Sequence, residues 1–269
     1  MGSDPISHDR QMHVTLLDSN SWLVEMAGKR LLIDPWLVGF LTFANQTWLF
    51  KGMRSQDRPI PEAIDLIVLS QGLEDHTHPP TLEKLNRNIP VVASPSAAKV
   101  VQKLGYTHIQ PLAIGETWKL EDLLEIRALK GSPIGPTTLE NGYLIKDLQA
   151  GTTLYYEPHG SHDPSLKEFA PIDVAIAPIV DLSLPLVGSI IQGTARALEL
   201  AQWVQPQIIL PTAAGGDISF EGFINTFLQA KGSASELQAK LQEKGIPTQV
   251  IEPKPGERIE LQLKQRITN

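Results

Sequence analysis

The order of short apolar runs along the chain constrains the fold more than any other feature. Two groups of strand-length runs alternate with helical patterns along the sequence. A β layer has an apolar face that must be buried against another layer. Along the chain, a group of strands is followed by a helix, and a second group of strands is followed by further helices. This order therefore predicts an α/β protein with two β layers, each covered by helices.

Individual elements follow from apolar periodicity and turn residues. We expect helices over Ala97–Leu104, Thr194–Val204 and Ser235–Lys244, the first after the N-cap residue Ser94 and the last stopped by Gly245. The expected strands are His13–Leu17, Trp22–Met26, Arg30–Ile33, Asp65–Ser70, Pro90–Ala93, Glu116–Leu120, Leu124–Leu129, Tyr143–Asp147, Thr153–Tyr156, Asp173–Ala177, Gln207–Leu210, Gln249–Ile251 and Arg258–Leu261.

Two glycine- and proline-containing segments, Gly131–Gly142 and Leu182–Ile191, are expected to be loops. The longest apolar stretch, Val174–Ile191, is interrupted by two prolines and an aspartate. A membrane-spanning helix needs about 20 mostly apolar residues, so this stretch is a poor candidate for one. We expect a cytoplasmic protein.

Composition excludes several kinds of chemistry. The chain has 269 residues, a net charge of −7 and no basic stripe, so a nucleic-acid partner is not expected. It has no cysteine, which excludes disulfides, thiolate metal sites and a cysteine nucleophile. Residues 1–12 are polar and are expected to be a disordered leader or a cloning remnant, with 13–269 as a single domain. No feature indicates an oligomeric state.

Four of the seven histidines fall in two short clusters, Glu74–His78 and Glu157–Asp163. Each cluster directly follows an expected strand, where α/β sheets usually place their sites. Imidazole and carboxylate groups alone can hold Zn²⁺, Mn²⁺ or Fe, and such ions lower the pKa of bound water to about 7. The alternative is that these are solvated loop residues with local hydrogen bonds.

Several segments resemble a known family. Leu31–Trp36 (LLIDPW), Asp65–Ser70 (DLIVLS) and Asp75-His76 resemble the start of the metallo-β-lactamase superfamily, closest to its compact UlaG-like or phospholipase-D-like branch of zinc-dependent hydrolases. The resemblance continues through Glu140–Ile145, Leu154–Tyr156, Asp173–Pro178 and Ala195–Pro211. It implies a four-layer αββα sandwich, in agreement with the two-layer prediction above.

The metal motif of that family is degenerate in this chain. The pattern His-x-His-x-Asp-His falls on Gln71, Leu73, Asp75 and His76, of which only the last two match. The family's bridging aspartate falls on or beside His159. The histidines expected near Gly131 and after Pro211 are absent. Because leucine cannot bind an ion, the resemblance does not imply an ordinary two-metal centre.

Two functions remain open. In the first, Asp75, His76 and His159 hold one divalent transition metal, Zn²⁺ or Mn²⁺, and the protein hydrolyses an ester, amide or phosphoester. Asp75 and Glu157 would be the catalytic carboxylates, with Glu157 taking up a proton, and the further possible ligands are His78, Glu157 and His162. In the second, the protein binds no metal and is an inactive relative that serves as a ligand- or protein-binding module.

An apolar segment also suggests a ligand. Five of the 16 aromatic residues (5 Trp, 4 Tyr and 7 Phe) lie in one short segment; they are Trp36, Phe40, Phe43, Trp48 and Phe50. One hypothesis is a lid or groove wall for an apolar or acyl-bearing small molecule, or a surface for a protein partner. The other is ordinary core and loop packing, since aromatic residues dominate cores.

Overall fold

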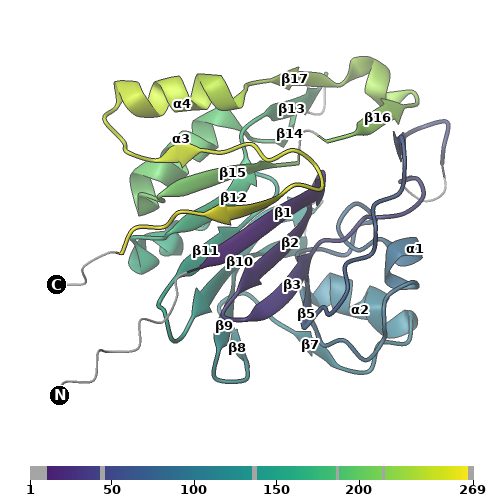
Figure 1. Ribbon diagram of the computed structural model, residues 1–269. Helices are drawn as coiled ribbons and strands as arrows, with labels where there is room; N and C mark the ends of the chain where they lie inside the picture. The colour runs from purple at the N-terminus through teal and green to yellow at the C-terminus, as the bar shows by residue number, and fades with distance from the viewer. Residues whose placement is uncertain (1–10, 43–45, 135–137, 186–187, 214–215, 266–269) are drawn as a thin grey trace.

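The structure, a computed structural model, describes residues 11–42, 46–134, 138–185, 188–213 and 216–265. Its first sheet has seven strands in the order β19-β1-β2-β3-β5-β6-β7 (Figure 1). Their bounds are β1 Met12–Asp18, β2 Ser21–Met26, β3 Lys29–Ile33, β5 Leu66–Leu69, β6 Val91–Ala93, β7 Ile109–Pro111 and β19 Arg258–Leu261. The run from β3 through β5 and β6 to β7 is parallel, and the other pairs are antiparallel.

The second sheet also has seven strands, in the order β18-β15-β12-β11-β10-β9-β8. Their bounds are β8 Thr117–Leu120, β9 Leu124–Ile134, β10 Thr138–Asp147, β11 Thr153–Tyr156, β12 Val174–Pro178, β15 Ile208–Thr212 and β18 Gln249–Val250. Here β11, β12, β15 and β18 are parallel. Each sheet thus joins an antiparallel half to a parallel half.

The alternation of side chains along each strand explains the layers, because successive residues point to opposite faces. On β5, Leu66 and Val68 enter the cluster between the sheets, whereas Ile67 and Leu69 enter a second cluster with the helices. Those helices are α1 (Pro79–Leu82) and α2 (Pro95–Lys103), and α3 (Thr194–Val204) and α4 (Ala234–Glu243) cover the second sheet through a third cluster. The expected αββα sandwich is confirmed (Figure 1).

Both expected loops contain strands instead. The segment Gly131–Gly142 belongs to the β9–β10 hairpin, and only residues 135–137 lie outside the described part. Gly131 is needed there because a Cβ would lie 2.8 Å from the backbone of Asn141 on the partner strand. Leu182–Ile191 contains the hairpin strands β13 (Asp181–Leu184) and β14 (Gly188–Ile191). Strands therefore extend into both segments beyond what periodicity suggested.

Two small sheets stand beside the sandwich. Strand β13 pairs with β14 and with β17 (Gln229–Lys231), and β4 (Lys51–Arg54) pairs with β16 (Ile218–Glu221). Two short 3₁₀ helices are also present, namely η1 (Pro164–Phe169) and η2 (Ile224–Phe227). The small strands gather at one end of the molecule, above the main sheets in Figure 1.

The aromatic segment divides between core and surface. Trp36, with Leu37, Val38 and Leu41, is buried, as the packing alternative expects. Phe40 and Trp48 are 52% and 67% exposed. Phe43 lies outside the described residues. The exposed part adjoins the β4–β16 sheet, where the Phe50 and Phe220 rings lie 5.6 Å apart.

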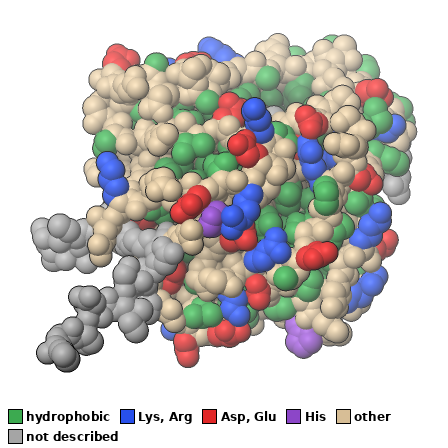
Figure 2. Space-filling view, viewed as in Figure 1, with side chains coloured by type: hydrophobic (Ala, Val, Ile, Leu, Met, Phe, Trp, Pro, Cys, Tyr) green, Lys and Arg blue, Asp and Glu red, His purple; other side chains and the backbone are tan. Residues whose placement is uncertain are grey.

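The start of the ordered core differs by one residue from expectation. Met12, placed in the leader, is fully buried and begins β1, while residues 1–10 lie outside the described part. In the described residues, none of the helices has the length and apolar character needed to cross a membrane. On the face shown in Figure 2, basic and acidic side chains are interspersed.

Candidate metal centre

The candidate site lies where strands of both sheets end. Strands β3 and β5 are parallel neighbours, so Asp34 and Ser70, which follow them, lie at the same edge. Strand β11 of the other sheet ends at Tyr156, whose hydroxyl donates to Asp34 Oδ2 over 2.6 Å. The loop after β11 therefore meets the loop after β5 at this edge.

Asp75, His76 and His159 are neighbours across these two loops. Each offers a ligand atom, and the three atoms lie within 4.8 Å of one another. His76 Nε2 is 3.1 Å from Asp75 Oδ2, and the rings of His76 and His159 are 5.0 Å apart between centroids. Oδ1 of Asp75 is buried and has no hydrogen-bond partner among the described residues.

Asp34 fixes the orientation of the His76 ring by contacting Nδ1, the ring nitrogen that does not face Asp75. Its Oδ2 lies 2.7 Å from His76 Nδ1, and its Oδ1 accepts the backbone N–H of Ser70 over 2.8 Å. The carboxylate is fully buried, and its residue has a φ of +42°, which is unusual for a non-glycine residue. With Nδ1 held in this way, the ring presents Nε2 to Asp75.

The charges of the site are strongly coupled. Burial lowers the pKa of His76, but Asp75 and Asp34 outweigh burial and raise it to about 10. Burial likewise opposes ionisation of Asp75, yet the charge of His76 gives that carboxyl a net lowered pKa. Without a bound cation, His76 is thus a charged imidazolium between two carboxylates. A cation at Nε2 would take the place of that proton.

His159 is a neutral imidazole. Burial, followed by the positive charge of His76, lowers its pKa to about 3. Its backbone is fixed on both sides, because its N–H donates to Glu157 Oε2 over 3.2 Å and its carbonyl accepts the N–H of Gln192 over 2.9 Å. The amide of Gln71 contacts its ring at 3.2 Å from Nδ1 and 3.5 Å from Nε2.

Glu157 is a fully buried carboxyl beside this loop. Its Oε2 accepts backbone N–H groups from His159 and, over 2.8 Å, from Ser161. Its Oε1 is buried with no hydrogen-bond partner in the described part of the chain. Burial raises its pKa to about 7 despite the bonds from Ser161 and His159. The group can therefore exchange a proton near neutral pH.

The other two histidines of the clusters lie outside the three-residue group. His78 is buried, with Nδ1 at 3.0 Å from Thr81 Oγ1 and Nε2 at 3.4 Å from the carbonyl of Phe40. His162 is also buried and packs against Tyr155, whose hydroxyl is 3.2 Å from Nδ1. Burial lowers the pKa of His78 to about 4 and that of His162 to about 3.

Sequence reasoning missed several residues that build the site. Tyr156 reaches Asp34 from the other sheet, Gln71 contacts His159, and Asn20 Nδ2 lies 3.4 Å from His76 Nε2. Tyr156 and Gln71 each stand at or just after a strand end, which is the one signal the sequence offered. The sequence does not indicate which residues they contact, since Gln71 and its partner His159, for example, are 88 positions apart.

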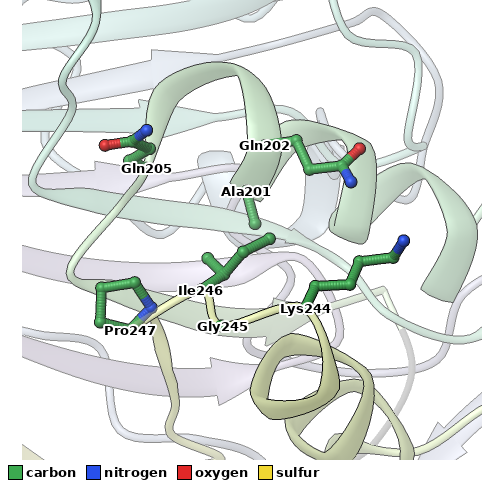
Figure 3. Close-up of a pocket in the computed structure, with 7 residues that line it drawn as sticks. All are labelled: Ala201, Gln202, Gln205, Lys244, Gly245, Ile246 and Pro247. Atoms are coloured by element: carbon green, nitrogen blue, oxygen red, sulfur yellow. The ribbon is translucent and has the colours of Figure 1, made fainter.

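Another hollow lies apart from these residues. A pocket of about 450 Å³ lies between the C-terminal ends of α3 and α4 (Figure 3), where Ile246 points toward Ala201. Its lining residues are Ala201, Gln202, Gln205, Lys244, Gly245, Ile246 and Pro247. None of these residues belongs to the candidate metal centre, so this pocket is separate from it.

Two β layers covered by helices, with a His/Asp cluster at their shared edge, define a protein of the metallo-β-lactamase fold. A profile of the beta-lactamase superfamily domain matches residues 13–213. The chain therefore belongs to the β-lactamase superfamily, and the resemblance seen in the sequence is confirmed.

Individual relatives agree with this family. The chain is 24% identical over 259 residues to a UPF0173 metal-dependent hydrolase of Methanopyrus kandleri, covering 93% of this chain and 100% of the relative. Its fold is similar to that of Igni18, a metallo hydrolase from Ignicoccus hospitalis (TM-score 0.66, 19% identity, 94% of this chain and 100% of the other). It is also similar to CmlA, a diiron β-hydroxylase from Streptomyces venezuelae (TM-score 0.66, 16% identity, 95% of this chain and 54% of the other). These structural similarities establish the fold and leave the reaction open.

Proposed function

We propose that this protein is a metal-dependent hydrolase that uses one divalent transition metal held by Asp75, His76 and His159. The observation that carries the proposal is the convergence of these three side chains, whose ligand atoms lie within 4.8 Å of one another. Three protein ligands with a position left for substrate are typical of catalytic zinc sites. The metal-dependent hydrolase of Methanopyrus kandleri supports the same class of activity.

The donor set fits Zn²⁺ or Mn²⁺ on observations of this chain. Two imidazoles and a carboxylate are ligands that both ions accept. Asp75 Oδ1 is buried without a partner among the described residues, which is costly unless something binds it. His76 is held through Nδ1 by Asp34, an arrangement that commonly orients metal-binding histidines.

The chemistry expected at this centre is hydrolysis of an ester, an amide or a phosphoester. A divalent metal there supplies Lewis acidity and makes water reactive near neutral pH. Glu157 accepts the proton released during attack, because its pKa of about 7 and its unpartnered Oε1 suit a general base. Asp75 would contribute one negative charge against the two positive charges of the cation.

We further propose that the substrate is a small molecule with an apolar or acyl part. Leu73, in the loop after β5, is 39% exposed, and Leu139 and Ile190 are each 43% exposed. Leu139 is two residues before Asn141, which donates to the carbonyl of Ser70, and Ile190 is two residues before Gln192, which donates to the carbonyl of His159. Exposed apolar side chains on segments that adjoin a site favour an apolar ligand.

Metal content is the direct test of the proposed centre. Protein purified without chelator or nickel resin should contain or take up about one equivalent of Zn²⁺ or Mn²⁺. His76→Ala and His159→Ala should lose this uptake, whereas His108→Ala, which changes an exposed histidine before β7, should keep it. Less than roughly a tenth of an equivalent of any transition metal, with no gain after adding Zn²⁺ or Mn²⁺, would remove the proposal.

The apolar part of the proposal has its own test. Among p-nitrophenyl esters of increasing acyl length, kcat/KM should rise with each added methylene, by up to about tenfold. Ile190→Asn should flatten this rise while Ile190→Val preserves it. A flat profile in the unmodified protein would argue against an apolar substrate.

A second candidate is an inactive relative that binds a ligand or a protein. Gln71 and Leu73 favour it, because they occupy two positions where the family pattern has metal-binding histidines. Exposed Phe40 and Trp48 also favour a binding surface. If His76→Ala and His159→Ala fold normally and leave in-cell function unchanged, binding is the better description.

A further inference from the structure

Asn20 brings a third loop to the candidate metal centre. It ends the turn between β1 and β2, it is 4% exposed, and its amide Nδ2 lies 3.4 Å from Nε2 of His76. Asp75 Oδ2 lies 3.1 Å from the same ring nitrogen, whereas Asp34 holds the other one. Asn20 and Asp75 thus both approach the nitrogen that is left for a cation.

The groups around the Asn20 amide decide which way it faces. The oxygen and the nitrogen of an amide occupy nearly the same positions after half a turn, so they are assigned from their partners. Because Asp75 Oδ2 is an acceptor 3.1 Å from His76 Nε2, a proton or a cation must lie between the two atoms. Either one repels an N–H₂ group and attracts an amide oxygen. The end of the amide beside His76 is therefore the oxygen.

The other end of the amide faces Thr212 Oγ1, at 3.4 Å. This hydroxyl accepts the indole N–H of Trp22 over 3.0 Å and lies 3.1 Å from the carbonyl of Ser19. A hydroxyl has one proton and two lone pairs. Its proton goes to the nearer acceptor, the carbonyl of Ser19, and its second lone pair accepts an N–H of Asn20. With the amide turned in this way, each of these groups has a partner.

We propose that Asn20 turns its amide oxygen to the candidate centre and is a further ligand of the cation, beside the three residues proposed above. This inference rests on the proposed metal site. Two ligand atoms about 2.1 Å from one ion in tetrahedral arrangement lie about 3.4 Å apart, which matches the separation between the Asn20 amide and His76 Nε2. Carbonyl oxygens suit Mn²⁺ better than Zn²⁺, so this ligand should contribute more to the binding of Mn²⁺.

The turn that carries Asn20 is held in one conformation. Asp18 and Ser19 have φ values of +118° and +49°, which residues other than glycine seldom adopt. The carboxylate of Asp18 is fully buried and accepts two N–H groups of Arg58, over 2.7 and 3.2 Å. The amide therefore stands at the centre before a cation arrives, and little conformational freedom is lost on binding.

Three substitutions in the full chain test the ligand role. Asn20→Leu removes the oxygen, Asn20→Asp keeps an oxygen and removes the N–H₂ group, and Asn225→Leu is the control. Asn225 also uses its amide, donating to the carbonyl of Phe220 over 2.8 Å, but it lies in η2, outside the candidate centre. Chelator competition measures the dissociation constants for Mn²⁺ and Zn²⁺, and circular dichroism checks that each variant is folded.

For Mn²⁺, the dissociation constant should rise at least about tenfold in Asn20→Leu, stay at or below the original value in Asn20→Asp, and stay unchanged in Asn225→Leu. The rise for Zn²⁺ in Asn20→Leu should be smaller. If Asn20 acted through its N–H₂ group instead, Asn20→Asp would bind as weakly as Asn20→Leu, because aspartate has no N–H. That result, or an unchanged dissociation constant in Asn20→Leu, would overturn the inference.

The orientation of the amide has a readout in the unmodified, metal-free protein. Nuclear Overhauser effects from the N–H₂ protons of Asn20 should reach the methyl group of Thr212 and not the ring protons of His76. The opposite pattern would overturn the inference even if Asn20→Leu does not fold. If the unmodified protein binds neither ion, the proposed function fails and the ligand role fails with it. If it binds them and Asn20→Leu binds them equally well, the inference fails and the proposed function stands.

Discussion

Replacing Tyr156 by phenylalanine tests whether the two sheets are joined through the candidate site. The hydroxyl of Tyr156, on the second sheet, donates to Asp34 Oδ2 over 2.6 Å, and Asp34 belongs to the first. Both residues are fully buried. Phenylalanine has the same ring and leaves no appreciable cavity, so the substitution removes only this hydrogen bond and a weaker one to the carbonyl of Asn20 at 3.3 Å.

The magnitude follows from the charge of the acceptor. A hydrogen bond to a charged group contributes about 1.5–3 kcal/mol, against about 0.5–1.5 kcal/mol for one between neutral groups. Tyr106 supplies the matched control, because its buried hydroxyl donates to the neutral carbonyl of Leu82 over 2.9 Å. Tyr156→Phe should therefore lower the free energy of unfolding by about twice as much as Tyr106→Phe.

Urea unfolding of the metal-free protein, followed by fluorescence and circular dichroism, measures both values. A loss of about 2 kcal/mol corresponds to a Tm lower by roughly 4–8 °C in a protein of this size. If Tyr156→Phe costs no more than Tyr106→Phe, Asp34 does not depend on the second sheet, and the account of how the site is assembled is wrong.

Three further outcomes are expected. His78 has a pKa of about 4 when folded against about 6.5 when unfolded, so it is protonated first in the unfolded chain. Its own contribution to the free energy of unfolding should thus fall by up to about 3 kcal/mol between pH 6.5 and pH 4, and in a urea titration His78→Phe should reduce the total fall over this range by about that amount. Gly160→Ala, at a φ of +80° where the new Cβ would overlap the carbonyl oxygen of Gln192, should destabilise the protein by about 2–4 kcal/mol. Gly28→Ala, at a φ of +69° with open space around it, should cost about 1 kcal/mol, and equal losses would contradict the close approach at Gly160. Zn²⁺ at about 100 times its dissociation constant should stabilise the unmodified protein by about 2.7 kcal/mol in a thermal shift assay and leave His159→Ala unaffected.

Local pattern was sufficient for most of the sandwich. The helix Thr194–Val204 and the strand Arg258–Leu261 have the bounds that the sequence predicts, because each has a complete apolar period and distinct ends. The hairpin across Gly131–Gly142 was not predicted, since its prolines and glycines resemble those of a loop. Only the close approach of Gly131 to Asn141 across the hairpin explains why glycine stands within a strand.

The sequence by itself determined the order of the layers, the loops that follow the strands, and the positions of Asp75, His76 and His159 in those loops. The tertiary structure alone decided that these side chains converge, that Asp34 holds His76, and that Gln71 contacts His159. The physical reason is distance along the chain: side-chain periodicity is set by neighbouring residues, whereas a contact such as that between Tyr156 and Asp34, 122 positions apart, exists only once two sheets have packed face to face.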